Sequence, residues 1–177
     1  EELRLRVGVG SELIGKSAVI NQLRQAIDRV APTSSRVLIT GPAGVGKEMI
    51  ARLLHGRSRR GNGPFVILNC ATMQPDRMEV ELFGIEPGGA GAGTPSKVGT
   101  FEQAHNGTLV LDEVADMPLE TQGKIVRVLQ EQTFLRLGGR GAEMRLERDV
   151  GERAQRAVLG QRLLLVDVEP GRGHVAG

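Results

Sequence analysis

The sequence predicts an α/β fold with three layers, in which helices cover both faces of a mostly parallel sheet. Three short apolar runs, at 36–40, 65–68 and 108–111, are typical of buried strands. Segments with the apolar spacing of helices separate these runs, and this alternation favours parallel strands joined by helices. A glycine-rich loop follows the first run, at a position where folds of this kind bind phosphate groups.

The first helix is predicted after Ser17, whose hydroxyl can cap the first turn. Apolar residues then recur every three or four positions as far as Val30, and Pro32 ends the helix. Residues 1–11 are charged and then glycine-rich, so we expect a linker from an upstream domain. Because the chain opens with Glu-Glu-Leu rather than Met, we expect it to be a fragment of a longer protein.

The remaining elements follow the same alternation. They are a helix at 47–55, a helix at 76–83, a short helix at 101–105, a helix at 119–131 and a hairpin strand at 133–137. Residues 84–99 hold many glycines among small residues and prolines. Such a segment cannot pack as a helix or a central strand, and it predicts a mobile loop.

The composition is that of an ordinary globular domain with one core. Of the 177 residues, 25% are charged and 40% are hydrophobic. Only 2% are aromatic, which argues against a nucleic-acid surface of stacked aromatic rings, and the net charge of +2 is too small to attract DNA by itself. A single cysteine, no signal peptide and no long apolar span predict a cytoplasmic protein without a membrane segment.

A loop with the pattern of a nucleoside triphosphate site follows the first strand. Its residues are Gly41, Pro42, Ala43, Gly44, Val45, Gly46 and Lys47. Backbone N–H groups of such a loop point at phosphate oxygens, and Lys47 would reach the β and γ phosphates. The next residue is usually a Ser or Thr that binds magnesium, but here it is Glu48. A chance glycine-rich turn is the alternative.

Two acidic residues, Asp112 and Glu113, end the third apolar run in a Walker B pattern. Asp112 would hold magnesium, and Glu113 would orient and activate the attacking water as a general base. The alternative is an ordinary polar strand end. Because the carboxyl ends of parallel strands meet at one edge, Gly41, Asn69 and Asp112 are predicted to converge there.

Asn69 ends the second apolar run, which we expect to neighbour the strand that ends at Asp112. Its amide could hydrogen-bond Glu113 and hold this carboxylate away from water. The alternative is that Asn69 caps the turn that follows it. Cys70 has no partner in the sequence and is interpreted as a small buried hydrophobe.

Five segments carry a resemblance to a known family. They are Leu13-Ile14-Gly15-Lys16-Ser17, residues 38–48, residues 65–71, Glu81-Leu82-Phe83-Gly84 and residues 107–113, with 111–118 in support. Together they resemble the AAA+ domain of bacterial enhancer-binding proteins, the sigma-54-dependent response regulators of the NtrC type, and are most similar to the NtrX-like branch. The resemblance runs from Glu12 to Gly139.

The resemblance implies a three-layer αβα P-loop NTPase (AAA+) core at 12–139, incomplete at the C-terminus, with ATP and Mg²⁺ as ligands. Proteins of this family hydrolyse ATP in a homo-oligomeric ring and use the energy to remodel RNA polymerase carrying sigma-54. DNA binding would need a domain absent from this chain.

The resemblance also assigns roles by position. Lys47 matches the phosphate-binding lysine, Asp112 and Glu113 match Walker B, and Asn69 matches the asparagine that restrains the Walker B glutamate. Leu13, Ile14 and Gly15 match the segment near the adenine. Glu48 is the family's usual residue, which leaves magnesium more dependent on Asp112, the phosphates and water.

Two segments depart from the family pattern. After Gly84 the family carries a Gly-Ala-Phe-Thr-Gly-Ala loop that contacts sigma-54, and here residues 85–94 lack its aromatic–threonine contact pair, which argues against direct sigma-54 contact. Residues 140–177 form an atypical tail with seven Arg and no Lys. In this tail we recognise none of the later parts of the family pattern, which are a sensor strand, an arginine finger, a helical lid and a DNA-binding domain. An out-of-frame reading or a premature end is expected, although 163–167 imitates a buried strand and could fill the missing sheet position.

Three interpretations therefore remain open. The chain is part of an ATP-dependent transcription activator, or a nucleotide-binding regulatory module without sigma-54 contact, or a non-functional truncated product. Because an arginine finger accelerates phosphoryl transfer by about 10³–10⁵, its absence predicts nucleotide binding with weak or no turnover.

Overall fold

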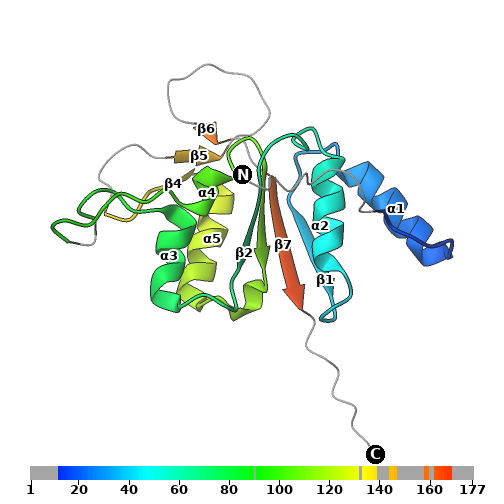
Figure 1. Ribbon diagram of the computed structural model, residues 1–177, viewed down its shortest axis with the longest axis horizontal. Helices are drawn as coiled ribbons and strands as arrows, with labels where there is room; N and C mark the ends of the chain where they lie inside the picture. The colour runs from blue at the N-terminus through cyan, green and yellow to red at the C-terminus, as the bar shows by residue number, and fades with distance from the viewer. Residues whose placement is uncertain are drawn as a thin grey trace, which may run out of the picture.

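Four parallel strands form the central sheet, in the order β1-β7-β3-β2. They are β1 (Val37–Gly41), β2 (Phe65–Asn69), β3 (Thr108–Asp112) and β7 (Arg162–Val168). The computed structural model describes residues 12–89, 91–131 and 133–138, together with strands at 144–146, 158–159 and 162–168. All four strands of the sheet run in the same direction, and their carboxyl ends lie at its lower edge in Figure 1.

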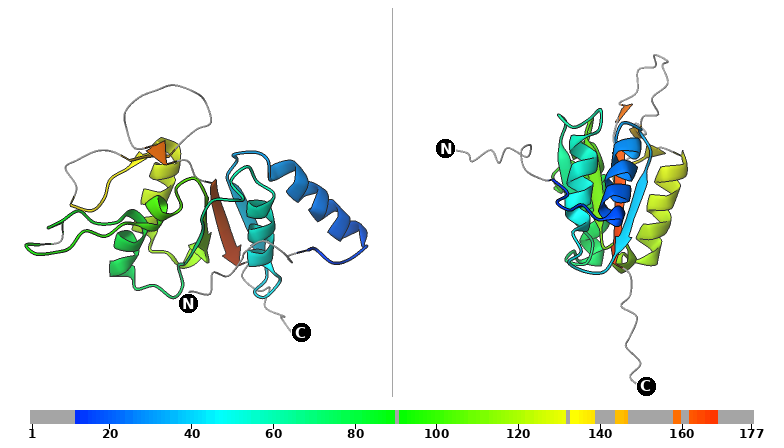
Figure 2. Two further views of the ribbon diagram at one scale, coloured as in Figure 1. Left: turned by 45° about the horizontal axis from the view of Figure 1, so that its top comes forward. Right: turned by 90° about the vertical axis from the view of Figure 1, so that its right-hand side faces the viewer.

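Helices cover both faces of this sheet (Figures 1 and 2). On one side lie α1 (Ala18–Val30) and α2 (Lys47–Gly56), and on the other lie α3 (Pro75–Phe83), α4 (Thr100–Gln103) and α5 (Leu119–Glu131). Each side has its own apolar core: Leu109 and Leu111 of β3 belong to the cluster that includes α5, and Val110 belongs to the cluster that includes α1. Successive strand residues point to opposite faces, so β3 is buried on both. The predicted three-layer α/β class is confirmed.

The helix boundaries follow from local chemistry. The Ser17 hydroxyl accepts a hydrogen bond from the Ile20 N–H at 3.3 Å, so it caps α1 as predicted. The same helix ends at Val30, two residues before Pro32. No helix in the part of the chain that the structure describes is long and apolar enough to cross a membrane.

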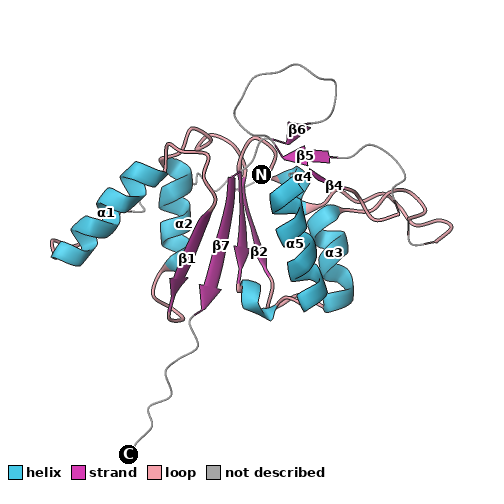
Figure 3. Cartoon of the chain, turned by 180° about the vertical axis from the view of Figure 1, so that it is seen from behind, coloured by secondary structure: helices cyan, strands magenta, loops and turns pink. Residues whose placement is uncertain are grey.

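A second, smaller sheet lies at the edge opposite the carboxyl ends of the large one (Figure 3). Its strands are β4 (Thr133–Phe134), β5 (Met144–Leu146) and β6 (Val158–Leu159), in that order. The predicted hairpin strand at 133–137 is shorter than expected, because only β4 pairs with β5. Leu137 instead forms an isolated bridge with Ile85 at the base of the glycine-rich loop.

The strand β7 occupies the centre of the large sheet, between β1 and β3. Thr40 is in register with Asp167, and Leu111 is in register with Leu165. The apolar run at 163–167 therefore lies within a strand of the sheet. This agrees with the alternative that the run fills the sheet position for which the sequence before Gly139 offers no strand.

Candidate functional site

A cavity of about 260 Å³ opens at the carboxyl edge of the large sheet. It is lined by Ala43, Gly44, Gly46, Lys47, Glu48, Asp112 and Glu113. All seven are site residues that the sequence predicted, and they come from two segments far apart in the chain. The fold thus brings the phosphate loop and the acidic pair to the walls of one cavity.

The loop between β1 and α2 needs glycine for conformational reasons. Gly46 immediately precedes α2 and has φ +95°, and Gly44 has φ +75°. An L-residue pays about 1–2 kcal/mol in this left-handed region, whereas glycine does not. The loop can therefore turn tightly and leave its N–H groups at the start of α2, where the helix dipole favours an anion.

Lys47 supplies the positive charge of the cavity, and its side chain is 9% exposed. Its Nζ donates hydrogen bonds to the carbonyl oxygens of Gly41 and Pro42, both at 3.0 Å. An ammonium group has three donors, so these two bonds leave one for a ligand. Lys47 lies along its own loop in this structure.

The acidic pair at the end of β3 faces the loop across the cavity. The Asp112 Oδ1 accepts a hydrogen bond from the Glu113 N–H at 3.1 Å. Glu113 itself has φ +53° and ψ +51°, a strained conformation for a residue other than glycine, of a kind that clusters at functional sites. Its carboxylate makes no hydrogen bond or ion pair with any described residue, which leaves its oxygens open to water or a ligand.

Asn69 lies in register with Asp112 on the neighbouring strand, as the sequence predicted. Its Oδ1 accepts hydrogen bonds from the N–H groups of Ala71 at 3.0 Å and Thr72 at 3.3 Å. The amide therefore caps the next turn, the alternative that the sequence left open. The described residues include no hydrogen bond between Asn69 and Glu113, so the restraint of Glu113 by Asn69 stays a prediction.

The predicted adenine segment lies outside the lining of the cavity. Leu13 is buried against the core under α1 and α2, whereas the side chain of Ile14 is 91% exposed. Arg24 of α1 donates hydrogen bonds to the carbonyl oxygens of Leu13 at 2.6 Å and Gly15 at 3.2 Å. Sequence reasoning missed this clamp, because an arginine in a helix does not reveal which carbonyls its side chain reaches.

Glu48 stands at the rim of the cavity and is already paired. Its Oε1 accepts hydrogen bonds from Arg52 at 2.9 and 2.6 Å, one helical turn along α2. No group of three or more His, Cys, Asp or Glu side chains within the described ranges is arranged to hold a metal ion by itself. A cation at this site would therefore need phosphate oxygens and water as further ligands.

Cys70 is buried beside the acidic residues. Burial, together with the smaller effects of the nearby carboxylates of Asp112, Asp116 and Glu113, raises the pKa of its thiol to about 12. A thiol with so high a pKa is neither a nucleophile nor a metal ligand at neutral pH. The interpretation of Cys70 as a small buried hydrophobe agrees with this environment.

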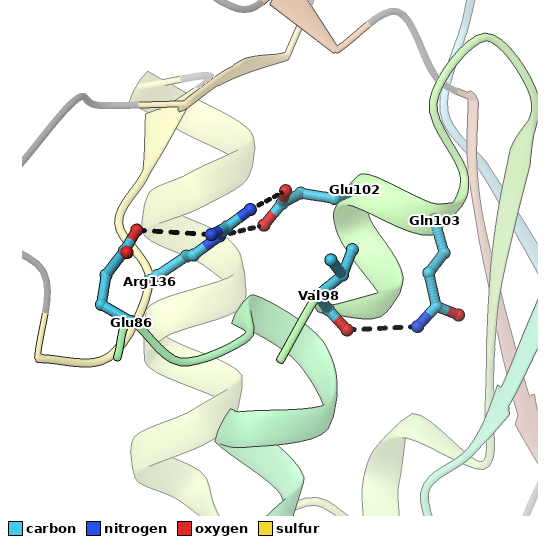
Figure 4. A network of polar contacts seen from close by, with 5 residues as sticks. All are labelled: Glu86, Val98, Glu102, Gln103 and Arg136. Carbon is cyan, nitrogen blue, oxygen red and sulfur yellow. Dashed lines mark hydrogen bonds and ion pairs between the residues drawn. The ribbon is translucent and has the colours of Figure 1, made fainter. Parts of the chain in front are cut away.

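The base of the glycine-rich loop is held by ion pairs, drawn in Figure 4. Arg136 binds both carboxylate oxygens of Glu102, at 2.7 and 2.6 Å, and lies 3.5 Å from Glu86. Backbone hydrogen bonds from Glu86 to Leu137 and from Leu137 to Gly84 reinforce this contact. The described residues of the loop form no regular helix or strand, as predicted, and the bridge between Ile85 and Lys97 joins its two ends.

A larger cavity, of about 360 Å³, lies between α3, α5 and β4. Phe83, Val128 and Phe134 form part of its apolar wall, and Glu79 and Lys124 are ion-paired at its rim. None of the site residues predicted from the sequence lines it. We therefore take the smaller cavity as the candidate functional site, because the phosphate loop and the acidic pair line it, although its volume is lower.

Comparison with known proteins gives a consistent set of similarities. The family model for the Sigma-54 interaction domain matches residues 13–151. The nitrogen assimilation regulatory protein NtrX of Azorhizobium caulinodans is 55% identical over 126 residues, which is 71% of this chain and 27% of that protein. The chain thus spans about a quarter of the length of this relative.

Solved structures agree with this result. Crystal structures of NtrX from Brucella abortus in complex with ADP and with ATP both superpose with a TM-score of 0.72. They are 48% and 49% identical to this chain, and each comparison covers 90% of this chain and 31% of the other. The fold is therefore that of a P-loop NTPase of the AAA+ type, as the sequence predicted.

Proposed function

Because this chain belongs to the Sigma-54 interaction domain family, we propose that it binds ATP and couples the bound nucleotide to the control of transcription. The observation that carries the proposal is the shared cavity, in which the phosphate loop, Lys47 and the acidic pair meet. The Brucella abortus relatives crystallised with ADP and with ATP support the same choice of ligand.

In this proposal the triphosphate lies along the loop at the start of α2. Lys47 exchanges its hydrogen bonds to Gly41 and Pro42 for bonds to phosphate oxygens. The exchange is favourable because the phosphate oxygens carry negative charge, so both partners of the new bond are charged, whereas a carbonyl oxygen is neutral. The N–H groups around Gly46 complete the anion site.

The residues of the cavity also fit a magnesium ion bound with the nucleotide. Asp112 would hold it, together with phosphate oxygens and water, since Mg²⁺ is usually bound by one or two carboxylates and substrate phosphates. The bound ion would neutralise phosphate charge. Glu48 is committed to Arg52, so Asp112 remains the better placed ligand.

Glu113 would act as the general base that orients and deprotonates the attacking water. Its free carboxylate and its strained backbone support this role. We propose that turnover by this chain is weak, because no arginine finger is recognisable after Gly139. A rate of ATP hydrolysis that rises steeply with protein concentration would contradict this proposal, because it would reveal working interfaces between subunits.

Binding of a fluorescent ATP analogue tests the site. We expect Lys47→Ala to weaken binding about 10- to 100-fold, because one charge-assisted bond to phosphate is lost. Glu113→Gln should bind nearly as well as the unmodified chain, because it affects the attacking water rather than the phosphates. Lys97→Ala, at the base of the glycine-rich loop, is the matched control. Equal affinity of the Lys47→Ala variant and the control would refute the proposal.

A second function is favoured by one observation, the composition of the glycine-rich loop. Between Gly84 and Gly99 there is no aromatic side chain, and Gly88, Gly91 and Gly93 all have positive φ. Such a loop offers little apolar surface to a protein partner. The chain would then be a nucleotide-binding regulatory module without sigma-54 contact.

A pull-down with sigma-54 separates the two functions. The chain is incubated with an ATP transition-state mimic, and retention of sigma-54 is compared with and without the mimic. Retention that depends on the mimic supports the activator, and its absence supports the regulatory module. The third interpretation, a non-functional product, predicts that ATP gives no protection against thermal unfolding.

A further inference from the structure

The proposed phosphate site has a negative charge on its own rim. Glu48 lies in the first turn of α2, directly after Lys47, and it helps to line the cavity. Its side chain is 57% exposed. A triphosphate is itself strongly anionic, so a free carboxylate at this position would repel it. An ATP site of this composition therefore requires a group that keeps the Glu48 charge away from the phosphates.

Without a partner, the Glu48 side chain would lean towards the phosphate side of the helix. Side chains of an α-helix tilt towards its N-terminus, which in α2 is the end at the phosphate loop. The positive end of the helix dipole attracts a carboxylate in the first turn, as it attracts a phosphate group. A free Glu48 carboxylate would thus compete with the triphosphate for the same end of the helix.

Arg52 draws this carboxylate the other way, along α2. Its Nε and Nη2 both donate hydrogen bonds to the Glu48 Oε1, at 2.9 and 2.6 Å. Because Arg52 lies one turn further along the helix, these bonds hold the carboxylate towards the second turn and away from the phosphate loop. The guanidinium charge also offsets the carboxylate charge within the pair.

Arg52 is held in turn by an aromatic ring from a different element. Its Cζ lies 4.9 Å from the centroid of the Phe65 ring, at the start of β2. Phe65 itself contacts the ring of the buried His55, with the two centroids 5.0 Å apart. The cation–π contact restricts the directions in which the guanidinium can point. A planar guanidinium can stack on a ring and bond a carboxylate at the same time, which an ammonium group cannot do as well.

We propose that Arg52 is a positioning residue of the nucleotide site, which holds the Glu48 carboxylate away from the triphosphate and from the cation bound with it. This role rests on the proposed function, because it matters only when a nucleotide occupies the cavity. Arg52 acts through Glu48 and touches neither the phosphates nor the attacking water. The pair also explains how the site tolerates Glu48 at a position where Ser or Thr usually binds magnesium.

The test measures how much Glu48→Gln changes the affinity for the fluorescent ATP analogue in two backgrounds, with EDTA in place of magnesium. In the otherwise unmodified chain we expect a gain of less than about threefold, because Arg52 already holds the carboxylate away. In the Arg52→Met background we expect a gain of about tenfold, because the freed carboxylate then faces the phosphates. Equal gains in the two backgrounds would overturn the proposal, because Arg52 would then not act through Glu48.

Magnesium separates this role from a purely structural one. Because Mg²⁺ can bind a carboxylate and phosphate oxygens together, the loss of affinity in Arg52→Met should shrink from about tenfold in EDTA to less than about threefold with the ion. The same loss in both solutions would indicate a distorted site and would overturn the proposal. Arg127→Met is the matched control, because it breaks an Arg–Glu pair of the same spacing on α5, with the Arg127 Nε 2.9 Å from Glu131. This control should bind like the unmodified chain, and a loss as large as that of Arg52→Met would also overturn the proposal.

Both variants of the pair should fold, since an exposed ion pair one helical turn apart contributes little to stability. If Arg52→Met does not fold, Glu48→Gln alone decides. A gain of less than about threefold in EDTA then supports the proposal, and a larger gain overturns it, because the carboxylate would not have been held away from the phosphates. Absence of binding by the unmodified chain, with and without magnesium, would instead refute the proposed function.

Discussion

Removal of the Glu102 charge should destabilise the chain and loosen the base of the glycine-rich loop. The carboxylate of Glu102 holds Arg136 by two hydrogen bonds of 2.7 and 2.6 Å, and the two side chains are only 11% and 19% exposed. Glu102 belongs to α4, Arg136 follows β4, and the same guanidinium reaches Glu86 at the start of the loop. One ion pair therefore connects three segments.

The magnitude follows from the geometry of the pair. Removing one partner of a buried ion pair costs about 3–5 kcal/mol, because the other charge is left uncompensated. Arg136 keeps some contact with water and its weaker contact with Glu86, so we expect about 2–4 kcal/mol for Glu102→Gln. For a domain of this size that loss lowers Tm by about 5–10 °C.

The assay is a double-mutant cycle measured by urea denaturation. Glu102→Gln, Arg136→Met and the double variant are compared with the unmodified chain. Glu86→Gln is the control, since this carboxylate is 40% exposed and 3.5 Å from Arg136, and it should change the free energy of unfolding by less than about 1 kcal/mol.

Additivity in this cycle would refute the reasoning. If the changes in the free energy of unfolding of the two single variants simply add, the coupling energy between Glu102 and Arg136 is zero, and their ion pair does not stabilise the chain. A second measurement concerns the loop itself: amides of residues 84–99 should exchange faster in Glu102→Gln than in Glu86→Gln. Equal exchange in both variants would show that the ion pair does not anchor the loop.

Two further predictions concern stability. Gly123 lies exposed inside α5 with open space around it, so Gly123→Ala should raise the free energy of unfolding by about 1 kcal/mol. Gly84→Ala should lower it by about 2 kcal/mol, because the φ of Gly84 is +78° and a Cβ would meet the Lys97 carbonyl oxygen at 2.5 Å. Thermal melts that rank the two variants in the opposite order would contradict this packing. The thiol of Cys70 has a pKa of about 12 in the folded chain against 9.0 for an ordinary thiol, so the unfolded chain releases this proton first as the pH rises. The free energy of unfolding should therefore fall from about pH 9 towards pH 12, by up to about 1.4 kcal/mol per pH unit. Cys70→Ala should lack this component, and an identical slope in both chains would disprove it.

Much of the fold was predictable because its signals are local. The periodicity behind α1, the capping Ser17 and the three apolar runs depend on residues close together in the sequence, and the structure confirms them. The hairpin strand at 133–137 was predicted too long, since Leu137 bonds to the base of the glycine-rich loop rather than to β5. No local pattern reveals such a distant partner.

The candidate site likewise has features that the sequence predicted and features that only the structure showed. The glycines and Lys47 of the phosphate loop carry a pattern that depends on short spacing, and so do Asp112 and Glu113. Two properties could not be read from the chain: that the Asn69 amide caps its own turn, and that Arg24 clamps the carbonyls of Leu13 and Gly15. Both depend on side-chain directions, which sequence spacing leaves open.

By itself the sequence determined the α/β class, the phosphate loop and the acidic strand end, because backbone conformation and strand burial are dictated by neighbouring residues. Only the tertiary structure decided that residues 162–168, rather than any segment within the family match, lie between β1 and β3. The physical reason is that an apolar run records only that it must be buried, whereas its place in a parallel sheet depends on hydrogen bonds to strands far away in the chain. The same distant pairing sets the distance between Lys47 and Asp112, on which the proposed nucleotide site depends.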